Sequence, residues 1–127
     1  MKEQIKMVEE FHTKFKQFQN TKPTLIGHSQ AVLRYVLGKE ELDEYITAVN
    51  DEDLIEVLDS LADQLYILYG TILKHGLQEH ILPAFELVHQ NNMAKLGPDG
   101  EPIIRVDGKI LKPDNFQKVE LKTILKL

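Results

Sequence analysis

The sequence contains no cysteine and no tryptophan among its 127 residues. Without cysteine the chain cannot use a thiol nucleophile, a disulfide or a cysteine-ligated zinc site. It also lacks an apolar run of the roughly 18 residues that a membrane-spanning helix needs, and its beginning carries acids instead of a signal-peptide core. We therefore expect a soluble, cytoplasmic protein with no membrane partner.

Repeats, low-complexity tracts and Ser/Gly linkers are missing as well. A chain of this length is typical of one domain, and it is long enough to bury a core without a disulfide or a structural metal. We predict a single domain over residues 1–127, with a helical body at 1–96 and a basic flap and tail at 97–127.

The acidic residues are concentrated in one segment. The net charge is −5, but residues 40–73 hold ten acidic residues and no Lys or Arg. The repulsion among so many negative charges is small if the carboxylates face water, and it is compensated if several of them bind one cation. The sequence has no evident basic face, so duplex nucleic acid is not an expected partner.

Hydrophobic spacing predicts four long helices separated by short breaks, at residues 3–18, 29–49, 53–75 and 79–95. Ser29 is the expected N-cap of the second helix, and Asp51 or Asp53 that of the third. Gly76 follows a basic last turn, as is typical after a helix end, and Pro83 suits the first turn of the fourth helix. Long helices with short connections favour an all-α antiparallel bundle of four to five helices.

The pattern changes after Leu96 to turn residues and short apolar pairs. Asp107-Gly108 between such pairs predicts a β-hairpin with a two-residue turn. Leu121, Ile124 and Leu125 predict a short closing helix.

Two glutamates continue an apolar helical stripe. Glu41 and Glu44 follow Leu33 and Leu37 at helical spacing, and Asp59 and Asp63 lie one turn apart on the next helix. If these helices pack antiparallel, four carboxylates can face one another. Oxygen ligands then favour Mg²⁺ or Mn²⁺ over zinc. The alternative to a metal site is an acidic face exposed to solvent. Arg34 is close enough to Glu41 along its helix to pair with an acid.

Several motifs occur together in one order. Glu40-Glu41-Leu42-Asp43-Glu44 reproduces a Glu-Glu-x-x-Glu pattern, and the segment from Asp59 to Tyr66 follows it. With the later segments around His75-Gly76, residues 88–95 and residues 107–113, this set resembles the all-α NTP pyrophosphohydrolase superfamily. That superfamily includes MazG proteins, dimeric dUTPases and phosphoribosyl-ATP pyrophosphohydrolases. The resemblance is strongest to the MazG-like branch with a C-terminal Asp-Gly-Lys-x-Leu-Lys flap.

The second acidic motif departs from the family pattern. The family has Glu-x-x-Asp, and aligning its Asp with Asp63 puts Ser60 where the Glu belongs. Asp59 lies one residue earlier and is the candidate substitute, while Glu56 is interpreted as a solvated residue.

The resemblance implies a metal-dependent hydrolase that converts a (d)NTP to the monophosphate and pyrophosphate, for nucleotide-pool clean-up. Glu41, Glu44 and Asp63, assisted by Asp59, would hold Mg²⁺, with Mn²⁺ as a possible substitute, and Glu40 would hold a further ion or orient water. The candidate substrate-binding residues are Tyr66, His89, Asn92, Lys95, Lys109 and Lys112. Tyr66 and His89 have structural alternatives as core or bundle residues, and each lysine has one as a surface residue.

The resemblance and the wide apolar arcs of the helices predict a homodimer or tetramer. The alternative function is a non-catalytic nucleotide-sensing or interaction module, which Ser60 favours. Within the enzyme class the alternative is phosphoribosyl-ATP hydrolysis, against which the flap segment argues.

Overall fold

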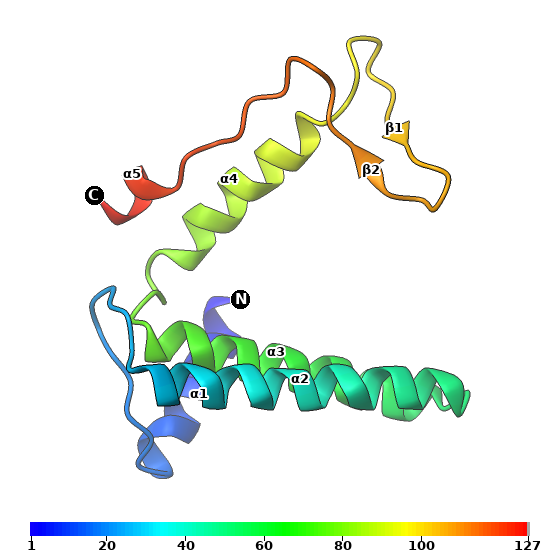
Figure 1. The fold of residues 1–127 in the computed structure, drawn as a ribbon. Coiled ribbons are helices and arrows are strands. Elements are labelled where there is room, and N and C mark those ends of the chain that lie inside the picture. The colour runs from blue at the N-terminus through cyan, green and yellow to red at the C-terminus, as the bar shows by residue number, and fades with distance from the viewer. Residues whose placement is uncertain (127) are drawn as a thin grey trace. The chain divides into compact units, whose positions relative to one another are not determined.

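The computed structural model describes residues 1–126, which form helices and one small sheet (Figure 1). The all-α prediction with a C-terminal hairpin is therefore confirmed. The chain divides into two compact units, an N-terminal unit, Met1–Glu79, and a C-terminal unit that begins at His80. No helix in the described part of the chain has the length and hydrophobicity needed to cross a bilayer.

Helix α1 (Lys2–Lys14) packs against α3 through its buried residues Ile5 and Val8. It ends before Phe18, the predicted limit, because the backbone turns left-handed at Lys16, with φ of 55°. The N–H of Gln17 donates to the carbonyl of His12 at 2.8 Å, which closes the helix end.

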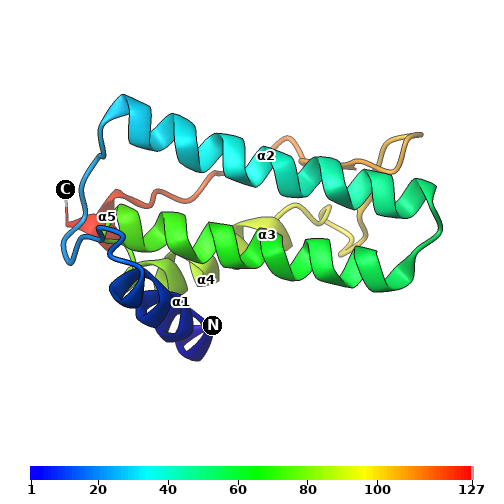
Figure 2. The same ribbon diagram turned by 90° about the horizontal axis from the view of Figure 1, so that it is seen from below.

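Helices α2 (His28–Asn50) and α3 (Leu54–Lys74) lie antiparallel along most of their length (Figure 2). The Asp53 side chain accepts a hydrogen bond from the Glu56 N–H at 3.1 Å, so the predicted cap of α3 is confirmed. The prediction that Ser29 is the N-cap of α2 is wrong, because Gly27 is the N-cap and Ser29 lies inside the first turn. Gly27 has no side chain that could cap the first turn, but its backbone, with φ of −56° and ψ of 150°, has the conformation that an N-cap residue adopts.

Gly76 ends α3 as predicted, with φ of +66°. Its N–H donates to Leu73 at 3.1 Å and the N–H of Leu77 donates to Ile72 at 3.0 Å, a pairing that satisfies the last carbonyls of the helix. A side chain at this position would collide with the backbone of Lys22. The segment after α1 is therefore held closely against the end of α3.

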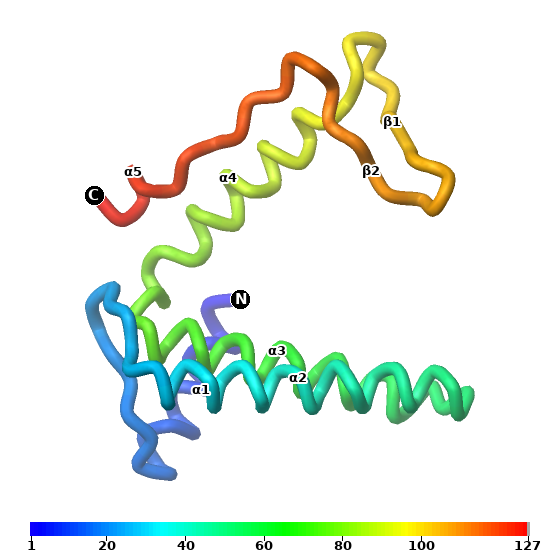
Figure 3. Tube along the Cα trace, viewed as in Figure 1, coloured from blue at the N-terminus to red at the C-terminus, as the bar shows by residue number. Residues whose placement is uncertain are grey.

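In the C-terminal unit, α4 (Ile81–Met93) is followed by strands β1 (Ile103–Ile104) and β2 (Ile110–Leu111) and by α5 (Lys122–Leu125). The segment between β2 and α5 returns beside α4 (Figure 3), where the N–H of Val119 donates to Asn91 Oδ1 at 2.8 Å. Both the fourth helix and the closing helix are thus confirmed.

The prediction of a two-residue turn in the hairpin is wrong. Arg105 donates its N–H to the carbonyl of Lys109 at 2.8 Å, and Gly108 donates to the carbonyl of Arg105 at 2.8 Å. Three residues, Val106 to Gly108, therefore form the loop. Gly108 supplies the positive φ, 90°, that such a longer turn requires at its last position.

Candidate functional site

Three carboxylates meet between α2 and α3. Glu41, Glu44 and Asp63 each offer one oxygen, and these three oxygens lie within 4.8 Å of one another. Glu41 and Glu44 share one face of α2 because they are three residues apart, and the antiparallel course of α3 brings Asp63 to the same level. We call these three residues the acidic cluster.

The acidic cluster is electrostatically unfavourable as it stands. Glu41 Oε2 is buried and has no hydrogen-bond partner. Burial, together with the charges of Glu44 and Asp63, raises the pKa of Glu41 to about 7. Burial and the charges of Asp59 and Glu44 also raise the pKa of Asp63. Both raised pKa values mean that ionising these carboxyl groups next to one another costs free energy.

The donor set fits a hard divalent cation. It consists of carboxylate oxygens alone, which Mg²⁺ and Mn²⁺ prefer. No Lys or Arg forms an ion pair with any member of the acidic cluster within residues 1–126. A cation would therefore supply the positive charge and the partner that Glu41 Oε2 lacks.

The other predicted acidic residues lie around the cluster. Asp59 is exposed, yet its charge contributes to the raised pKa of both Glu41 and Asp63. Glu40 is exposed and is not among the three clustered residues. Ser60, which we expected at the position of the Glu in the second acidic motif, is 2% exposed and donates its hydroxyl to the carbonyl of Val57 at 3.0 Å.

A recess of about 400 Å³ adjoins the cluster and was not foreseen from the sequence. Glu44 and Ser60 line it together with Glu56, which is one turn before Ser60 on α3. Glu56 is exposed, in agreement with its interpretation as a solvated residue. The sequence feature that could have indicated this recess is Ser60, a small side chain on an acid-rich helix.

Tyr66 lies one turn beyond Asp63 on α3 and is 40% exposed. Its ring meets Phe11 of α1 edge-on, with centroids 5.6 Å apart, and Phe11 stacks on Phe15 at 4.4 Å. Tyr66 thus belongs to a partly exposed aromatic group with Phe11 and Phe15, one turn from Asp63 along α3.

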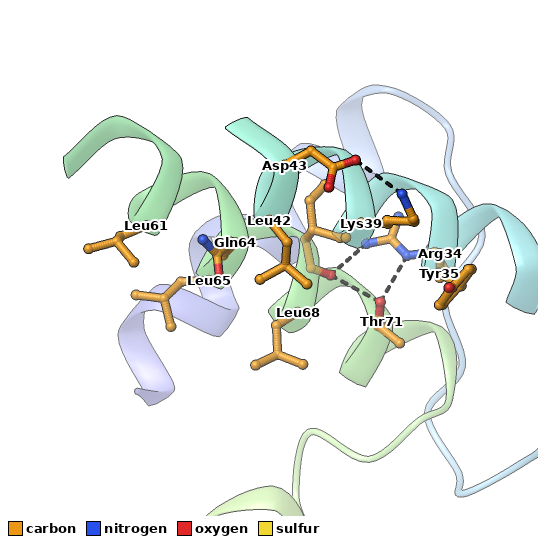
Figure 4. A pocket seen from close by; sticks show the side chains of 12 residues that line it. Arg34, Tyr35, Lys39, Leu42, Asp43, Leu61, Gln64, Leu65, Leu68 and Thr71 are labelled. Carbon is orange, nitrogen blue, oxygen red and sulfur yellow. Dashed lines mark hydrogen bonds and ion pairs between the residues drawn. The ribbon is translucent and has the colours of Figure 1, made fainter. Parts of the chain in front are cut away.

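A larger groove of about 910 Å³ lies between other faces of α2 and α3 (Figure 4). Leu42, Leu61, Leu65 and Leu68 give it a mainly apolar wall, and Lys39 pairs with Asp43 at its rim at 3.1 Å. The wide apolar arc of α3 predicted exposed hydrophobic surface, but hydrophobic spacing alone did not predict a groove.

Arg34 forms no ion pair with an acid among residues 1–126, so that expectation is wrong. Its Nε donates to Thr71 Oγ1 at 3.0 Å and its Nη2 donates to the carbonyl of Ile67 at 2.7 Å (Figure 4). The carbonyl of Ile67 also accepts from the Thr71 hydroxyl at 3.1 Å, as is common for a helical threonine. Arg34 therefore joins α2 to α3 through neutral groups.

The remaining predicted substrate-binding residues belong to the C-terminal unit. His89 and Asn92 are exposed on α4, and Lys95 is half-buried just after it. Lys109 is exposed at the hairpin turn, and Lys112 is exposed with its Nζ 5.3 Å from the ring centroid of Phe116.

Comparison with known proteins gives three findings. Residues 8–92, which include the whole acidic cluster, match the family described as phosphoribosyl-ATP pyrophosphohydrolase. An uncharacterised protein of Acanthamoeba polyphaga mimivirus is 50% identical over 38 residues, which are 30% of this chain and 15% of that protein. A crystal structure of a candidate NTP pyrophosphohydrolase from Exiguobacterium sp. 255-15 aligns with 97% of this chain and 91% of its own, at 27% identity and a TM-score of 0.46.

Proposed function

The chain belongs to the phosphoribosyl-ATP pyrophosphohydrolase family, whose match covers well over half of its length, and on this premise we propose that it is a metal-dependent nucleoside triphosphate pyrophosphohydrolase. The reaction would split the α–β anhydride of a (d)NTP, giving the monophosphate and pyrophosphate. The observation that supports this most directly is the acidic cluster of Glu41, Glu44 and Asp63, with oxygens within 4.8 Å of one another. Removal of unwanted nucleotides from the cytoplasmic pool is the role that we propose for it.

The acidic cluster would hold Mg²⁺ or Mn²⁺, with Asp59 as the fourth carboxylate in place of the family's Glu. When bound, the metal would neutralise phosphate charge and lower the pKa of a bound water. Hydrolysis forms one bond between the water oxygen and a phosphorus and breaks the bridging P–O bond, while the proton of the water must pass to a base. Glu40 is exposed and immediately precedes Glu41 in the chain, and it is our candidate for orienting that water.

A triphosphate is a polyanion, so cationic side chains are needed beyond the metal. We propose Lys95, Lys109 and Lys112 as partners of the phosphate oxygens, since each is a point charge with rotatable donors. Tyr66, 40% exposed one turn from Asp63, would stack on the base. His89 and Asn92 are exposed and would hydrogen-bond the substrate.

We also propose that two copies pair through the groove of Figure 4. The leucines that line it are between 44% and 56% exposed, and a contiguous apolar wall of this kind is typical of an interface. Leu65→Glu should therefore reduce the mass found by sedimentation. Leu54→Glu is the control, because Leu54 is 79% exposed and lies outside the groove. A monomeric wild type, or equal effects of both variants, would contradict the pairing.

The activity is tested by pyrophosphate release from the common NTPs and dNTPs, dUTP included, and from phosphoribosyl-ATP. Each substrate is assayed with Mg²⁺, with Mn²⁺ and with EDTA, for the wild type and for Asp63→Asn. Glu3→Gln is the control, since Glu3 is an exposed carboxylate in the first turn of α1 and lies outside the acidic cluster and its recess. We expect metal-dependent release that Asp63→Asn loses and Glu3→Gln keeps.

The alternative function, a nucleotide-sensing module without turnover, predicts a different outcome. The observation that favours it is Ser60, whose buried hydroxyl is bonded to its own helix and offers no carboxylate. A nucleotide that raises the melting temperature in the presence of Mg²⁺ but is never hydrolysed would support that module. Pyrophosphate release from phosphoribosyl-ATP and from no other substrate of the panel would identify phosphoribosyl-ATP as the substrate.

A further inference from the structure

A second cluster of ionisable groups lies apart from the acidic cluster and has the opposite sign. It consists of His12 on α1, Arg34 on α2 and Lys74 at the end of α3, and we call it the basic cluster. His12 and Lys74 are each only 3% exposed. Lys74 lies one turn after Gly70 on the same face of α3. Burial and the charges of Lys74 and Arg34 lower the pKa of His12.

Gly70 of α3 shows how tightly two of these groups pack. A Cβ atom at Gly70 would lie 2.5 Å from Arg34 Nη2 and 3.1 Å from His12 Nε2. The absence of a side chain at Gly70 therefore lets the guanidinium and the imidazole approach the same point of α3.

The basic cluster has no acidic counterpart. Neither Arg34 nor Lys74 forms an ion pair in the part of the chain that the structure describes. The Nδ1 atom of His12 is buried without a hydrogen-bond partner. Lys74 Nζ lies 3.9 Å from the centroid of the Phe18 ring, a contact that compensates a buried ammonium only in part. Burial and the charge of Arg34 lower the pKa of Lys74, whereas a bound anion would stabilise the charged forms of both residues.

We propose that the basic cluster is a binding site for a phosphate group, separate from the metal-dependent site. A tetrahedral oxyanion has enough acceptors for an ammonium, a guanidinium edge and an imidazole N–H together. The ring of Phe18, which is 42% exposed in the segment after α1, lies over Lys74 Nζ, and we expect the anion to reach the cluster from this side.

The position of the basic cluster suits a ligand related to the proposed reaction. Arg34 is seven residues before Glu41 on α2, and Gly70 is seven residues after Asp63 on α3. Because the helices are antiparallel, both steps run in the same direction, about 10 Å at 1.5 Å per residue. Phosphate or pyrophosphate bound there would occupy the same helix pair as the acidic cluster without touching its carboxylates.

The test measures anion binding by the chain of residues 1–127 in EDTA, where no metal can bring a phosphate to the acidic cluster. Phosphate, pyrophosphate and a nucleoside monophosphate are titrated by calorimetry, against sodium chloride of equal ionic strength. The variants are Lys74→Met, which removes the charge, Lys74→Arg, which keeps it, and Lys14→Met as the control on α1. The Lys14 side chain is 71% exposed and pairs with Glu10, so it has no part in the cluster.

We expect phosphate or pyrophosphate to bind to the wild type, Lys74→Arg and Lys14→Met, and at least tenfold more weakly to Lys74→Met. Tighter binding of the monophosphate than of either inorganic anion would mean that the phosphate group belongs to a nucleotide. A second readout needs no variant: the imidazole resonances of His12 should shift when phosphate is added to the wild type.

Equal effects of phosphate and chloride, unshifted His12 resonances, or unchanged affinity in Lys74→Met would each overturn the inference. None of these results touches the proposed activity, because metal-dependent pyrophosphate release is measured independently.

Discussion

Replacing Glu41 with glutamine should stabilise the metal-free protein at pH 8. The side chain is partly buried, and burial together with Glu44 and Asp63 raises the pKa of its carboxyl from 4.5 to about 7. Each pKa unit corresponds to 1.36 kcal/mol, so the full shift is equivalent to about 3 kcal/mol. Solvent screening of a part-exposed group reduces this, and we expect a gain of about 1–2 kcal/mol.

The gain should depend on pH in a definite direction. Below pH 4.5 the Glu41 carboxyl is protonated in both the folded and the unfolded chain and costs nothing. Between pH 4.5 and about 7 the unfolded chain ionises first, so the wild type loses stability as the pH rises. Above about pH 7 Glu41 is ionised in the folded chain too, and the loss of folding stability that its ionisation causes is complete. The advantage of Glu41→Gln should therefore appear across this interval and then level off.

The assay is urea unfolding followed by circular dichroism in EDTA at fixed protein concentration, from pH 4 to pH 8, for the wild type and Glu41→Gln. Repeating the series with Mg²⁺ should reverse the order, because the cation stabilises the wild type through the carboxylate that the variant lacks. A variant less stable than the wild type at pH 8 in EDTA, or a difference that does not change with pH, would refute the electrostatic reasoning.

Three further predictions concern other parts of the chain. Glu52→Gly should raise the free energy of unfolding by about 1 kcal/mol in urea titrations, because Glu52 follows α2 with a φ of 54° that glycine adopts without strain; no gain would contradict this. Burial, Lys74 and Arg34 lower the pKa of His12 from 6.5 to about 4, so this histidine should cost about 3 kcal/mol of stability as the pH falls from 6.5 to below 4. Unfolding of His12→Gln should lack that part of the acid sensitivity, and an identical pH profile would disprove the assignment. Lys109→Ala should raise KM for the triphosphate with little change in stability, since Lys109 is exposed, and unchanged kinetics would remove the hairpin from the site.

The helices and the acidic cluster could be predicted because local rules determine them. Asp53 caps α3 through its own side chain, and Gly76 ends it through a positive φ, so both signals lie in the sequence at the helix end itself. Glu41 and Glu44 come together with Asp63 because helical spacing and a short connection leave the antiparallel pair few other registers.

The errors arose where several local solutions were compatible with the sequence. Ser29 is a better N-cap by residue type, yet the N-cap of α2 lies two residues earlier, at Gly27. Asp107-Gly108 fits both a two-residue and a three-residue loop, and the hydrogen bond from Arg105 to Lys109 selects the longer one.

Long-range contacts were the least predictable. Arg34 bonds to Thr71 and Ile67, which are more than thirty residues away, and the spacing along α2 contains no information about them. The burial of His12 and Lys74 likewise depends on where α1 crosses α3, which requires the packed structure.

The most direct test of the central claim is to identify the products by ³¹P NMR, using the best substrate of the panel with Mg²⁺. The account predicts a nucleoside monophosphate and pyrophosphate in equal amounts, no products in EDTA, and none from Asp63→Asn, while Glu3→Gln reacts like the wild type. A diphosphate with inorganic phosphate, turnover in EDTA, or full activity of Asp63→Asn would contradict it.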